Sequence, residues 1–428
     1  MLSTVFPYGN KGDEAIYKTS IELIRRYCPK CNISLSVFST PGFEPDHHLL
    51  WNLYRIEHIV SHPANILGNT FKWFSREREK RLKKIVLSAY RFFYWDLSPI
   101  LSPVVPLFKN SRLMSELQNT DLFIIIGHPL VKALLPICLP AYSIKKMLRK
   151  PTLLFPFSIT LDPFSRAKIF DSILKCYVKS SLRNMEALLL RERHSMQYLL
   201  NVMNITKNVF LSADTAFLSI SANKSSTFHK LQEMGIYIEQ PAIAVAPRGD
   251  CFKDVLMKEK YGEFVCKMAV LLDKVVKELR ANLYFTPTAM HEDLYVINDI
   301  SRLMKYKKNT WVINTSSMDP TEVKTVLSFM DFLITMRLHA GILAANAYVP
   351  SVVIMPSYDL KSVGVIEDMG LSNYFISLES PQLTSQQMLD KVLSLNNNLE
   401  EQKNSLKERI PKLQRRAELA GKTLKLFI

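Results

Sequence analysis

Short apolar runs, each followed within two residues by a polar one, constrain the fold of this chain more than any other feature. They recur at residues 122–126, 153–157, 187–190, 209–211, 242–246, 283–285, 311–313, 332–336 and 352–355. Segments with helical character, such as residues 252–280, separate most of them. Strands that alternate with helices are typical of parallel βαβ units. The sequence therefore predicts an α/β protein built on parallel sheets.

The chain length and a break in this pattern predict two domains. With 428 residues the chain can form two separate cores. Residues 220–238 are polar and loop-like, so we expect one domain at residues 1–235 and a second at residues 236–385. Residues 386–428 are rich in Leu, Lys, Glu and Gln, which predicts an amphipathic helical tail. Pro411 should mark a break or a new helix start in that tail.

The composition is that of a folded protein, with 48% hydrophobic and 22% charged residues. No uncharged apolar run reaches the ~18 residues of a membrane span, so we expect none. The first residues lack the basic start and apolar core of a signal peptide. Of the six cysteines only Cys28 and Cys31 form a CxxC pair, without further ligands at metal-site spacing. We therefore expect a cytoplasmic protein with reduced thiols and no bound metal.

The net charge of +16 favours an anionic partner, which could be a phosphorylated small molecule, an acidic membrane face or nucleic acid. Residues 40–110 form an aromatic and basic insertion that does not follow the strand–helix alternation. Within it, residues 72–91 carry eight Lys or Arg against two Glu. Two interpretations stay open for this run: peripheral contact with the inner face of the plasma membrane, and a solvated helix packed on the first domain. No nucleic-acid-binding signature occurs, so we expect no nucleic acid partner.

Arg337 and His339 follow the apolar run 332–336 and precede a segment of small residues suited to a helix lying close on a sheet. In an open parallel sheet, ligands collect beyond the carboxyl ends of the strands. The start of the following helix also presents N–H groups and a partial positive charge. The pattern predicts that a guanidinium and an imidazole meet an anionic substrate here.

Other predicted strand ends carry further candidates, each with a simpler structural interpretation beside the functional one. Arg248 is a clamp for a carboxylate or phosphate, since its planar fork matches either group. Arg191 either reaches a cleft or joins a surface salt-bridge cluster. Asp214 is a cap or a substrate contact. Lys361 reaches the same crevice or is solvated.

The first residues of the chain predict a short strand, and the loop that follows it has two glycines and contains Asn10, Gly12 and Asp13. Glycine permits a tight turn and close approach of the backbone to a ligand. Asp13 can cap the following helix, while the preceding residues expose N–H groups to an anion. A simple turn with a helix cap explains the pattern equally well.

Taken in order, these elements resemble the polysaccharide pyruvyl transferase family. Five family patterns carry the resemblance: G-N-x-G-D, R-D-x-x-S, D-P-A, R-x-H-A and Y-x-x-K. The matching residues are Gly9, Asn10, Gly12 and Asp13; Arg191, Glu192 and Ser195; Asp214, Thr215 and Ala216; Arg337, Leu338, His339 and Ala340; Tyr358 and Lys361. Glu192 and Thr215 depart from the usual Asp and Pro, and Gly127-His128-Pro129 departs from a glycine-rich turn of the family. The patterns span almost the whole chain.

The resemblance implies two Rossmann-like domains facing a cleft, similar to the GT-B arrangement. It also implies transfer of a pyruvyl group from phosphoenolpyruvate to two hydroxyls of a sugar, forming a ketal in cell-surface polysaccharide or exopolysaccharide biosynthesis. The acceptor would be a sugar or a lipid-linked oligosaccharide, and phosphoenolpyruvate would be a donor substrate with no further cofactor.

Under this resemblance the candidate residues take specific roles. His339 is the expected general acid for the methylene carbon of the donor. The expected cationic contacts are Arg337 and Arg248, followed by Arg191 and Lys361. Asp13 or Asp214 orients or deprotonates the acceptor hydroxyls, and Asn10 and Gly12 contact substrate.

Two other function classes remain open. One is a nucleotide-sugar-dependent GT-B glycosyltransferase, which also binds phosphates between two such domains. The other is a non-enzymatic basic protein that binds a membrane surface or nucleic acid, for which the net charge and residues 72–91 are the motivation.

Overall fold

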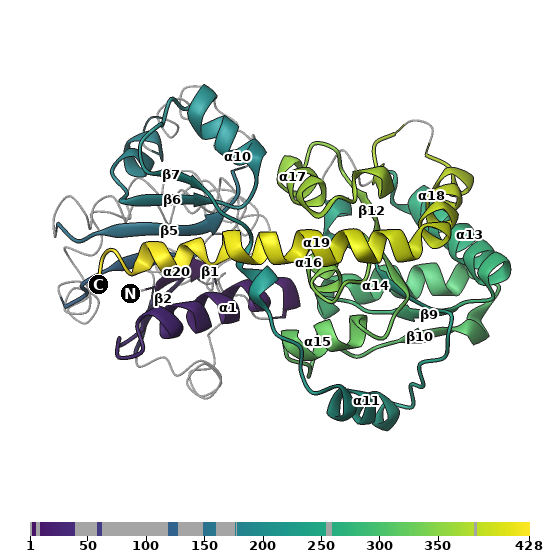
Figure 1. Cartoon of the computed structure of the whole chain (residues 1–428). Helices are drawn as coiled ribbons and strands as arrows, with labels where there is room; N and C mark the ends of the chain where they lie inside the picture. Colours follow the sequence, from purple (N-terminus) through teal and green to yellow (C-terminus); the bar gives the residue numbers. More distant parts are fainter. Residues whose placement is uncertain are drawn as a thin grey trace, which may run out of the picture. The chain divides into compact units, whose positions relative to one another are not determined.

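The computed structural model is shown in Figure 1. It describes residues 2–5, 9–38, 58–61, 119–126, 149–159, 176, 178–253, 259–380 and 383–428. The chain divides into two compact units. The first contains residues 1–6, 20–213 and 418–428, and the second contains residues 7–19 and 214–417.

A seven-stranded parallel sheet forms the centre of the first unit, in the order β3-β2-β1-β4-β5-β6-β7. Its strands are β1 (Leu2–Val5), β2 (Ser34–Phe38), β3 (His58–Ser61), β4 (Phe123–Ile125), β5 (Thr152–Phe157), β6 (Ala187–Leu190) and β7 (Val209–Leu211). Every residue of β4, β5 and β6 is buried. Helices cover both faces of a parallel sheet, which explains why these strands appear in the sequence as continuous apolar runs.

Few helices of the first unit lie in its described residues. They include the second half of α1 (Lys11–Tyr27), the helical residues 178–183, α10 (Arg193–Gln197) with the π-helical turn η2 (Tyr198–Val202), and α20 (Leu419–Leu424). The short helix α20 packs against β5. Glu418, just before it, pairs with Arg26 and accepts a hydrogen bond from the Tyr27 hydroxyl at 3.0 Å. These contacts hold the end of the chain on the end of α1.

The second unit contains a six-stranded parallel sheet in the order β10-β9-β8-β11-β12-β13. Its strands are β8 (Ala242–Ala246), β9 (Asn282–Phe285), β10 (Thr310–Val312), β11 (Phe332–Thr335), β12 (Ser351–Met355) and β13 (Phe375–Ser377). The chain runs outward from β8 to β10 and then returns to β11 on the other side of β8. This doubly wound order is that of a Rossmann-like sheet.

Helices flank this second sheet (Figure 1). They are η3 (Thr215–Leu218), α11 (Lys224–Glu233), η4 (Asp250–Lys253), α13 (Tyr261–Leu279), α14 (Met290–Leu303), η5 (Lys307–Asn309), α15 (Pro320–Leu327), α16 (Leu338–Ala345), α17 (Leu360–Met369), η6 (Ser372–Tyr374), α18 (Ser385–Asn397) and α19 (Leu399–Ala417). Right-handed crossovers put α13 and α14 on one face and α16 and α17 on the other, because the direction of winding reverses between them. Consistently, α13 packs with α14 and α18, and α16 packs with α15.

Each of the nine predicted apolar runs overlaps a strand, which confirms the α/β prediction. The predicted helical tail is present as α18, α19 and α20. Only β3 is described within residues 40–110, so the basic run 72–91 and both interpretations of it lie outside the described residues. The turn at residues 127–129 also lies outside them.

The division into units differs from the predicted boundaries at 235 and 385. Residues 214–235 and 386–417 belong to the second unit, together with residues 7–19. The reason is packing: η3 contacts both α16 and α19, and α11 contacts α15.

The prediction that Pro411 breaks the tail is wrong, because Pro411 lies inside the continuous helix α19. Proline has no N–H and normally disrupts a helix interior. Here Leu406, Ile410 and Leu413 on the same helix are buried, so their packing holds α19 together across the missing hydrogen bond.

Candidate functional site

Several candidate residues follow the carboxyl ends of the central strands of the second sheet, the edge where ligands bind in open parallel sheets. β8 and β11 are neighbours, but the chain leaves them toward opposite edges of the sheet, which defines a topological switch point. Thr335 of β11 lies opposite Ala246 of β8. Arg337 and Arg248 therefore follow two residues beyond the same register position. The sequence prediction of a polar site at this edge agrees with the topology.

His339 lies in the first turn of α16 and packs directly on the glycine loop of residues 9–14. A Cβ atom added to Gly12 would lie 2.5 Å from His339 Nδ1 and 2.6 Å from its Cγ, closer than real atoms approach. Position 12 therefore has room only for glycine, since the imidazole occupies the space of a side chain. The loop and His339, 327 residues apart in sequence, form one structural feature.

The glycine loop is held in place by its own side chains and by the second sheet. Asn10 Oδ1 accepts a hydrogen bond from Gly12 N at 3.0 Å, and Glu14 Oε1 accepts one from Gly9 N at 3.1 Å. Lys11 N donates to the carbonyl of Thr288, beyond β9, at 2.7 Å. The prediction that Asp13 caps the helix is wrong, because α1 begins at Lys11 and Asn10 accepts from Gly12 N. Asp13 lies half-buried inside the first turn of α1, where a carboxylate stabilises the helix dipole.

Asp214 faces the other side of the imidazole. Its Oδ2 lies 3.6 Å from His339 Nε2, and its side chain is fully buried. Asp214 also caps η3, where its Oδ1 accepts a hydrogen bond from Ala216 N at 2.9 Å. His339 Nε2 is buried and has no hydrogen-bond partner among the described residues. The Asp214 carboxylate therefore lies within ion-pair distance of the imidazole.

The structure gives Arg337 a different environment from the predicted anion clamp. Its guanidinium contacts two carboxylates at the start of α14. Nη2 lies 2.5 Å from Asp293 Oδ1 and 3.1 Å from Glu292 Oε2, and Nε donates to Asp293. Arg337 is only 7% exposed and Asp293 is fully buried. A buried guanidinium requires such compensation, so the role that these contacts support is to fasten the β11–α16 junction to α14.

Arg248 and Lys361 occupy the same carboxyl edge of the sheet. Arg248 is half-buried, and the next residue, Gly249, accepts a hydrogen bond from the Tyr295 hydroxyl at 2.5 Å. Lys361, in the first turn of α17, lies 3.8 Å from Asp359 through its Nζ atom. These two cations follow β8 and β12, the strands on either side of β11.

Arg191 belongs to the first unit and is buried. Its Nε donates to the Ser158 hydroxyl at 3.0 Å. Glu192 caps α10 by accepting a hydrogen bond from Ser195 N at 2.9 Å, and it also contacts the Ser195 hydroxyl. Burial raises the pKa of Glu192 although these hydrogen bonds oppose the shift. The R-E-x-x-S element thus joins the ends of β5 and β6, which is a structural role different from the predicted substrate contact.

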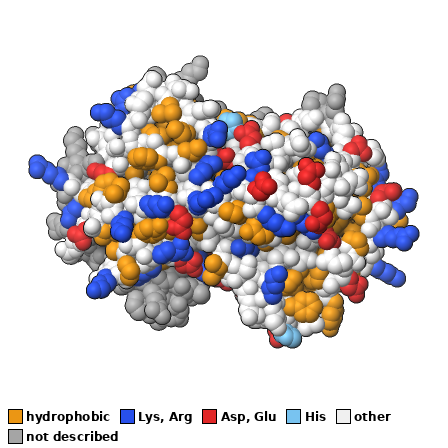
Figure 2. All heavy atoms as spheres, in the orientation of Figure 1, with side chains coloured by type: hydrophobic (Ala, Val, Ile, Leu, Met, Phe, Trp, Pro, Cys, Tyr) orange, Lys and Arg blue, Asp and Glu red, His pale blue; other side chains and the backbone are white. Residues whose placement is uncertain are grey.

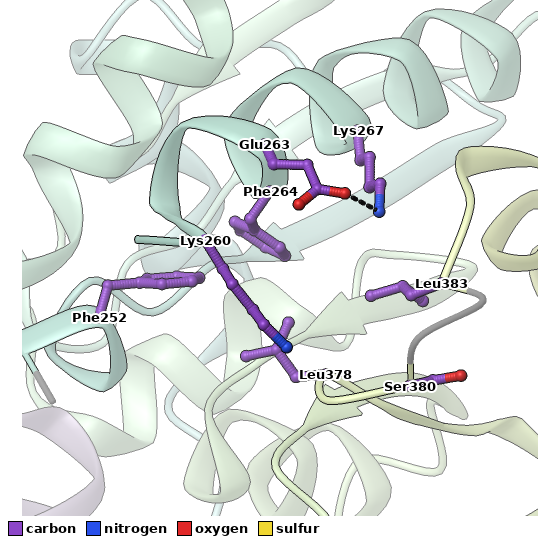
Figure 3. Close-up of a pocket in the computed structure, with 8 residues that line it drawn as sticks. All are labelled: Phe252, Lys260, Glu263, Phe264, Lys267, Leu378, Ser380 and Leu383. Carbon is purple, nitrogen blue, oxygen red and sulfur yellow. Dashed lines mark ion pairs between the residues drawn. The ribbon is translucent and has the colours of Figure 1, made fainter. Parts of the chain in front are cut away.

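A separate pocket in the second unit lies between the start of α13 and the chain after β13 (Figure 3). Phe252, Phe264, Leu378 and Leu383 supply its apolar walls. Lys267 pairs with Glu263 at 2.5 Å, so much of its charge is compensated. None of the predicted site residues lines this pocket.

The described residues give no sign of a metal centre: no group of three or more His, Cys, Asp or Glu side chains is arranged to hold an ion. Within the same part of the chain, no helix combines the length and apolar character needed to cross a membrane. Figure 2 shows Lys and Arg side chains spread over the drawn face, with Asp and Glu between them.

Sequence reasoning missed the residues that surround the predicted site. Asp293 and Glu292 have the signature of an acidic helix start, which by itself indicates only a favourable helix terminus. Asn346, at the end of α16, has no sequence signal that connects it to the site. Asp293, Glu292 and Asn346 come near the site only through the packing of elements that are distant in sequence.

The architecture and the sequence patterns together define a class of protein. Two doubly wound parallel sheets, followed by a helical tail, are the arrangement of GT-B glycosyltransferases and related epimerases. Residues 10–358 match the sequence model of a protein family described as "Polysaccharide pyruvyl transferase". The chain belongs to the polysaccharide pyruvyl transferase family. No curated protein sequence matches it.

Solved structures similar to this chain share its fold at low sequence identity. UDP-GlcNAc 2-epimerase from Neisseria meningitidis, bound to UDP-GlcNAc, has a TM-score of 0.56 at 11% identity, over 99% of each chain. Anabaena HepE, in complex with UDP and glucose, has a TM-score of 0.57 at 10% identity, over 99% of this chain and 97% of that one. A UDP-glucosyltransferase from Polygonum tinctorium has a TM-score of 0.57 at 12% identity, over 100% and 98%. At these identities the similarity concerns the fold alone.

Proposed function

We propose that this protein transfers the pyruvyl group of phosphoenolpyruvate to two hydroxyls of a sugar, releasing phosphate and forming a ketal. Membership of the family supports this activity. The observation that carries the proposal is the position of His339 at the switch point of the second sheet, between Gly12 and Asp214. A titratable group held beside a carboxylate at a ligand-binding edge suits a reaction that begins with proton transfer.

The chemistry assigns a proton donor to the first step. His339, protonated and stabilised by Asp214, donates a proton to the methylene carbon of phosphoenolpyruvate, which becomes a methyl group. The neighbouring carbon then accepts one hydroxyl oxygen. A second hydroxyl oxygen displaces phosphate from the same carbon, and the hydroxyl protons leave to the imidazole and to phosphate.

The donor carries a carboxylate and a phosphate, so the site requires several positive groups. Arg248 and Lys361 are the proposed contacts, because both follow strands beside β11. Backbone N–H groups at the start of α16 add a further attraction for an anion. In this proposal Arg337 does not contact the donor, because Asp293 and Glu292 compensate its charge. It holds the β11–α16 junction, and thereby His339, against α14.

The acceptor side of the site follows from the glycine loop. Asn10, Gly12 and Asp13 belong to the segment that packs on His339. In the proposal Asp13 orients or deprotonates an acceptor hydroxyl, and Asp214 serves the imidazole instead. The acceptor is a sugar or a lipid-linked oligosaccharide in polysaccharide biosynthesis, and the reaction takes place in the cytoplasm, where the donor is produced.

A nucleotide-sugar glycosyltransferase is the second candidate, and two of the similar structures favour it because they hold UDP-GlcNAc or UDP with glucose. Ligand choice separates the two candidates. The purified protein would be heated in the presence of phosphoenolpyruvate and of a panel of sugar nucleotides. Stabilisation by phosphoenolpyruvate is the expected result. Stabilisation by a sugar nucleotide alone would favour the glycosyltransferase.

The transfer itself is tested with phosphoenolpyruvate and a panel of sugar acceptors. We expect release of phosphate that depends on the acceptor, together with a new methyl signal from the ketal in the product spectrum. Phosphate release at the same rate without an acceptor would contradict transfer, since it would indicate hydrolysis of the donor.

A further inference from the structure

A buried group of polar side chains joins η3 to α16 at the ends opposite to Asp214 and His339. Asp214 caps the start of η3, and His339 lies in the first turn of α16. At the other ends, Asn346, which caps α16, donates through Nδ2 to the carbonyl of Ser219, which caps η3, at 2.8 Å. The same two elements therefore meet at both ends, once through the proposed catalytic pair and once through this hydrogen bond.

Two further elements contribute to this contact. Gln414 of α19 donates through Nε2 to Asn346 Oδ1 at 2.9 Å and to the carbonyl of Phe217 at 3.2 Å. Lys324 of α15 donates to the Ser219 carbonyl at 2.6 Å. Side chains from three helices thus satisfy the last carbonyls of η3, and we name Lys324, Asn346 and Gln414 the η3 clamp.

The η3 clamp matters because η3 has little stability of its own. It is a four-residue 3₁₀ helix, and such short helices persist only when their end groups are satisfied. The distance from Asp214 Oδ2 to His339 Nε2 is 3.6 Å, so a small shift of η3 would separate the carboxylate from the imidazole. By contrast, α16 carries His339 and Asn346 on one rigid element.

We propose that Asn346 and Gln414 are positioning residues, which hold Asp214 against His339 by fixing the far end of η3. This inference rests on the proposed function for its kinetic consequence, but not for its structural one. It gives the tail helix α19 a part in the active site, although no residue of α19 belongs to the predicted site. A purely stabilising role for Gln414 would leave the imidazole undisturbed.

The test uses Gln414→Leu in the full-length protein, with Gln402→Leu as the matched control. Gln402 lies on the same helix and is not one of the residues of the η3 clamp. The imidazole signals of His339 would be followed by NMR in histidine-labelled protein and assigned through His339→Gln. We expect Gln414→Leu to move these signals in the same direction as Asp214→Asn, and Gln402→Leu to leave them in place.

Kinetics supply the second readout, through a double-mutant cycle. Gln414→Leu should lower kcat by about tenfold to hundredfold with little change in KM, as expected for a misplaced catalytic group. In the Asp214→Asn background the same change should have little further effect, because both act through one pair. Asn346→Asp, which removes the donor with little change in shape, should behave as Gln414→Leu does.

The outcomes distinguish this inference from the proposed function. Unmoved His339 signals in Gln414→Leu, or losses of kcat that multiply independently of Asp214→Asn, would overturn the positioning role. If the protein transfers no pyruvyl group, the proposed function fails, and the NMR comparison still decides whether Gln414 positions His339. If the leucine variant does not fold, Gln414→Asn, shorter by one methylene, takes its place.

Discussion

At the scale of single residues, the site depends on the space that Gly12 leaves open for His339. The requirement for glycine here is one of close approach, since no unusual backbone angle is recorded at Gly12. Neighbouring Gly9, by contrast, has a φ of 86°, which L side chains rarely adopt. The two glycines of the loop therefore serve different purposes, one for the turn and one for the imidazole.

Gly12→Ala should displace His339 and lower the rate of transfer by about a hundredfold, since a misplacement near 1 Å can have that effect. Gly262→Ala is the control, because position 262 lies in α13 and nothing surrounds its added Cβ within 4 Å. The control should keep full activity and a thermal midpoint equal to or above that of wild type. Equal activity of the two variants would contradict the packing described for His339.

The ion pair of Arg337 predicts unequal effects of its two carboxylate partners on stability. Asp293→Ala leaves a buried guanidinium without its main partner and should lower the free energy of unfolding by about 3–5 kcal/mol. Glu292→Ala should lower the free energy of unfolding by less than about 1 kcal/mol, because the Glu292 side chain is 40% exposed. Urea denaturation measures both values. Equal losses of stability in the two variants would contradict the conclusion that Asp293 is the main partner of Arg337.

Sequence reasoning identified the residues that end strands but could not identify their partners. Arg337 and His339 stand out because a guanidinium and an imidazole follow the same apolar run and precede a predicted helix start. Whether Arg337 is a substrate clamp or part of a structural ion pair depends on the carboxylates that α14 places beside it. The sequence does not reveal them, because α14 lies more than 30 residues earlier in the chain. The pairing of His339 with Asp214 also depends on long-range packing. The sequence therefore left two interpretations of Asp214 open, a helix cap and a substrate contact.

At the scale of helices and strands, the apolar runs predicted nine strands and missed β1, β2, β3 and β13, although the first residues of the chain separately predicted β1. β4, β5, β6, β8, β11 and β12 are buried throughout, so their sequences are continuously apolar. β2, with the sequence SLSVF, alternates polar and apolar residues. β3 and β13 lie at the edges of their sheets and contain four and three residues. Short or alternating strands produce no apolar run and therefore escape this pattern.

The contact between α15 and η3 predicts a dependence of stability on pH. Burial lowers the pKa of Lys324 from 10.5 to about 8. Between these pH values the unfolded chain binds more protons than the folded one, so the free energy of unfolding rises with pH. Below about pH 8 both states carry the proton and the penalty for burying the charge is complete. The rise across this window should amount to at most about 3 kcal/mol.

Lys324→Met cannot titrate and should lack this rise, which urea denaturation near pH 7.5 and near pH 9.5 would reveal. The difference in stability between wild type and variant should move in favour of wild type as the pH increases. Lys305→Met, at an exposed position, serves as the control and should follow wild type. A constant difference between wild type and Lys324→Met would mean that this amine is not buried as described.

At the scale of the whole molecule, the fold defines a framework and the site residues define the chemistry. Proteins with the same architecture include epimerases and glucosyltransferases of UDP-sugars, at 10–12% identity to this chain. One fold commonly hosts several activities, so the similarity does not select the reaction. In the proposed function, the reaction is assigned from the family match and from His339, Asp214 and Gly12, which all belong to the second unit.

The most direct test of the proposed function compares acceptor-dependent phosphate release from phosphoenolpyruvate in wild type, His339→Gln and His229→Gln. His229 is exposed on α11 and serves as the matched control. Loss of a general acid should lower the rate in His339→Gln by at least about a hundredfold. The variant should still be stabilised thermally by phosphoenolpyruvate, and His229→Gln should retain the wild-type rate. Full turnover by His339→Gln would contradict the proposal that this imidazole protonates the donor.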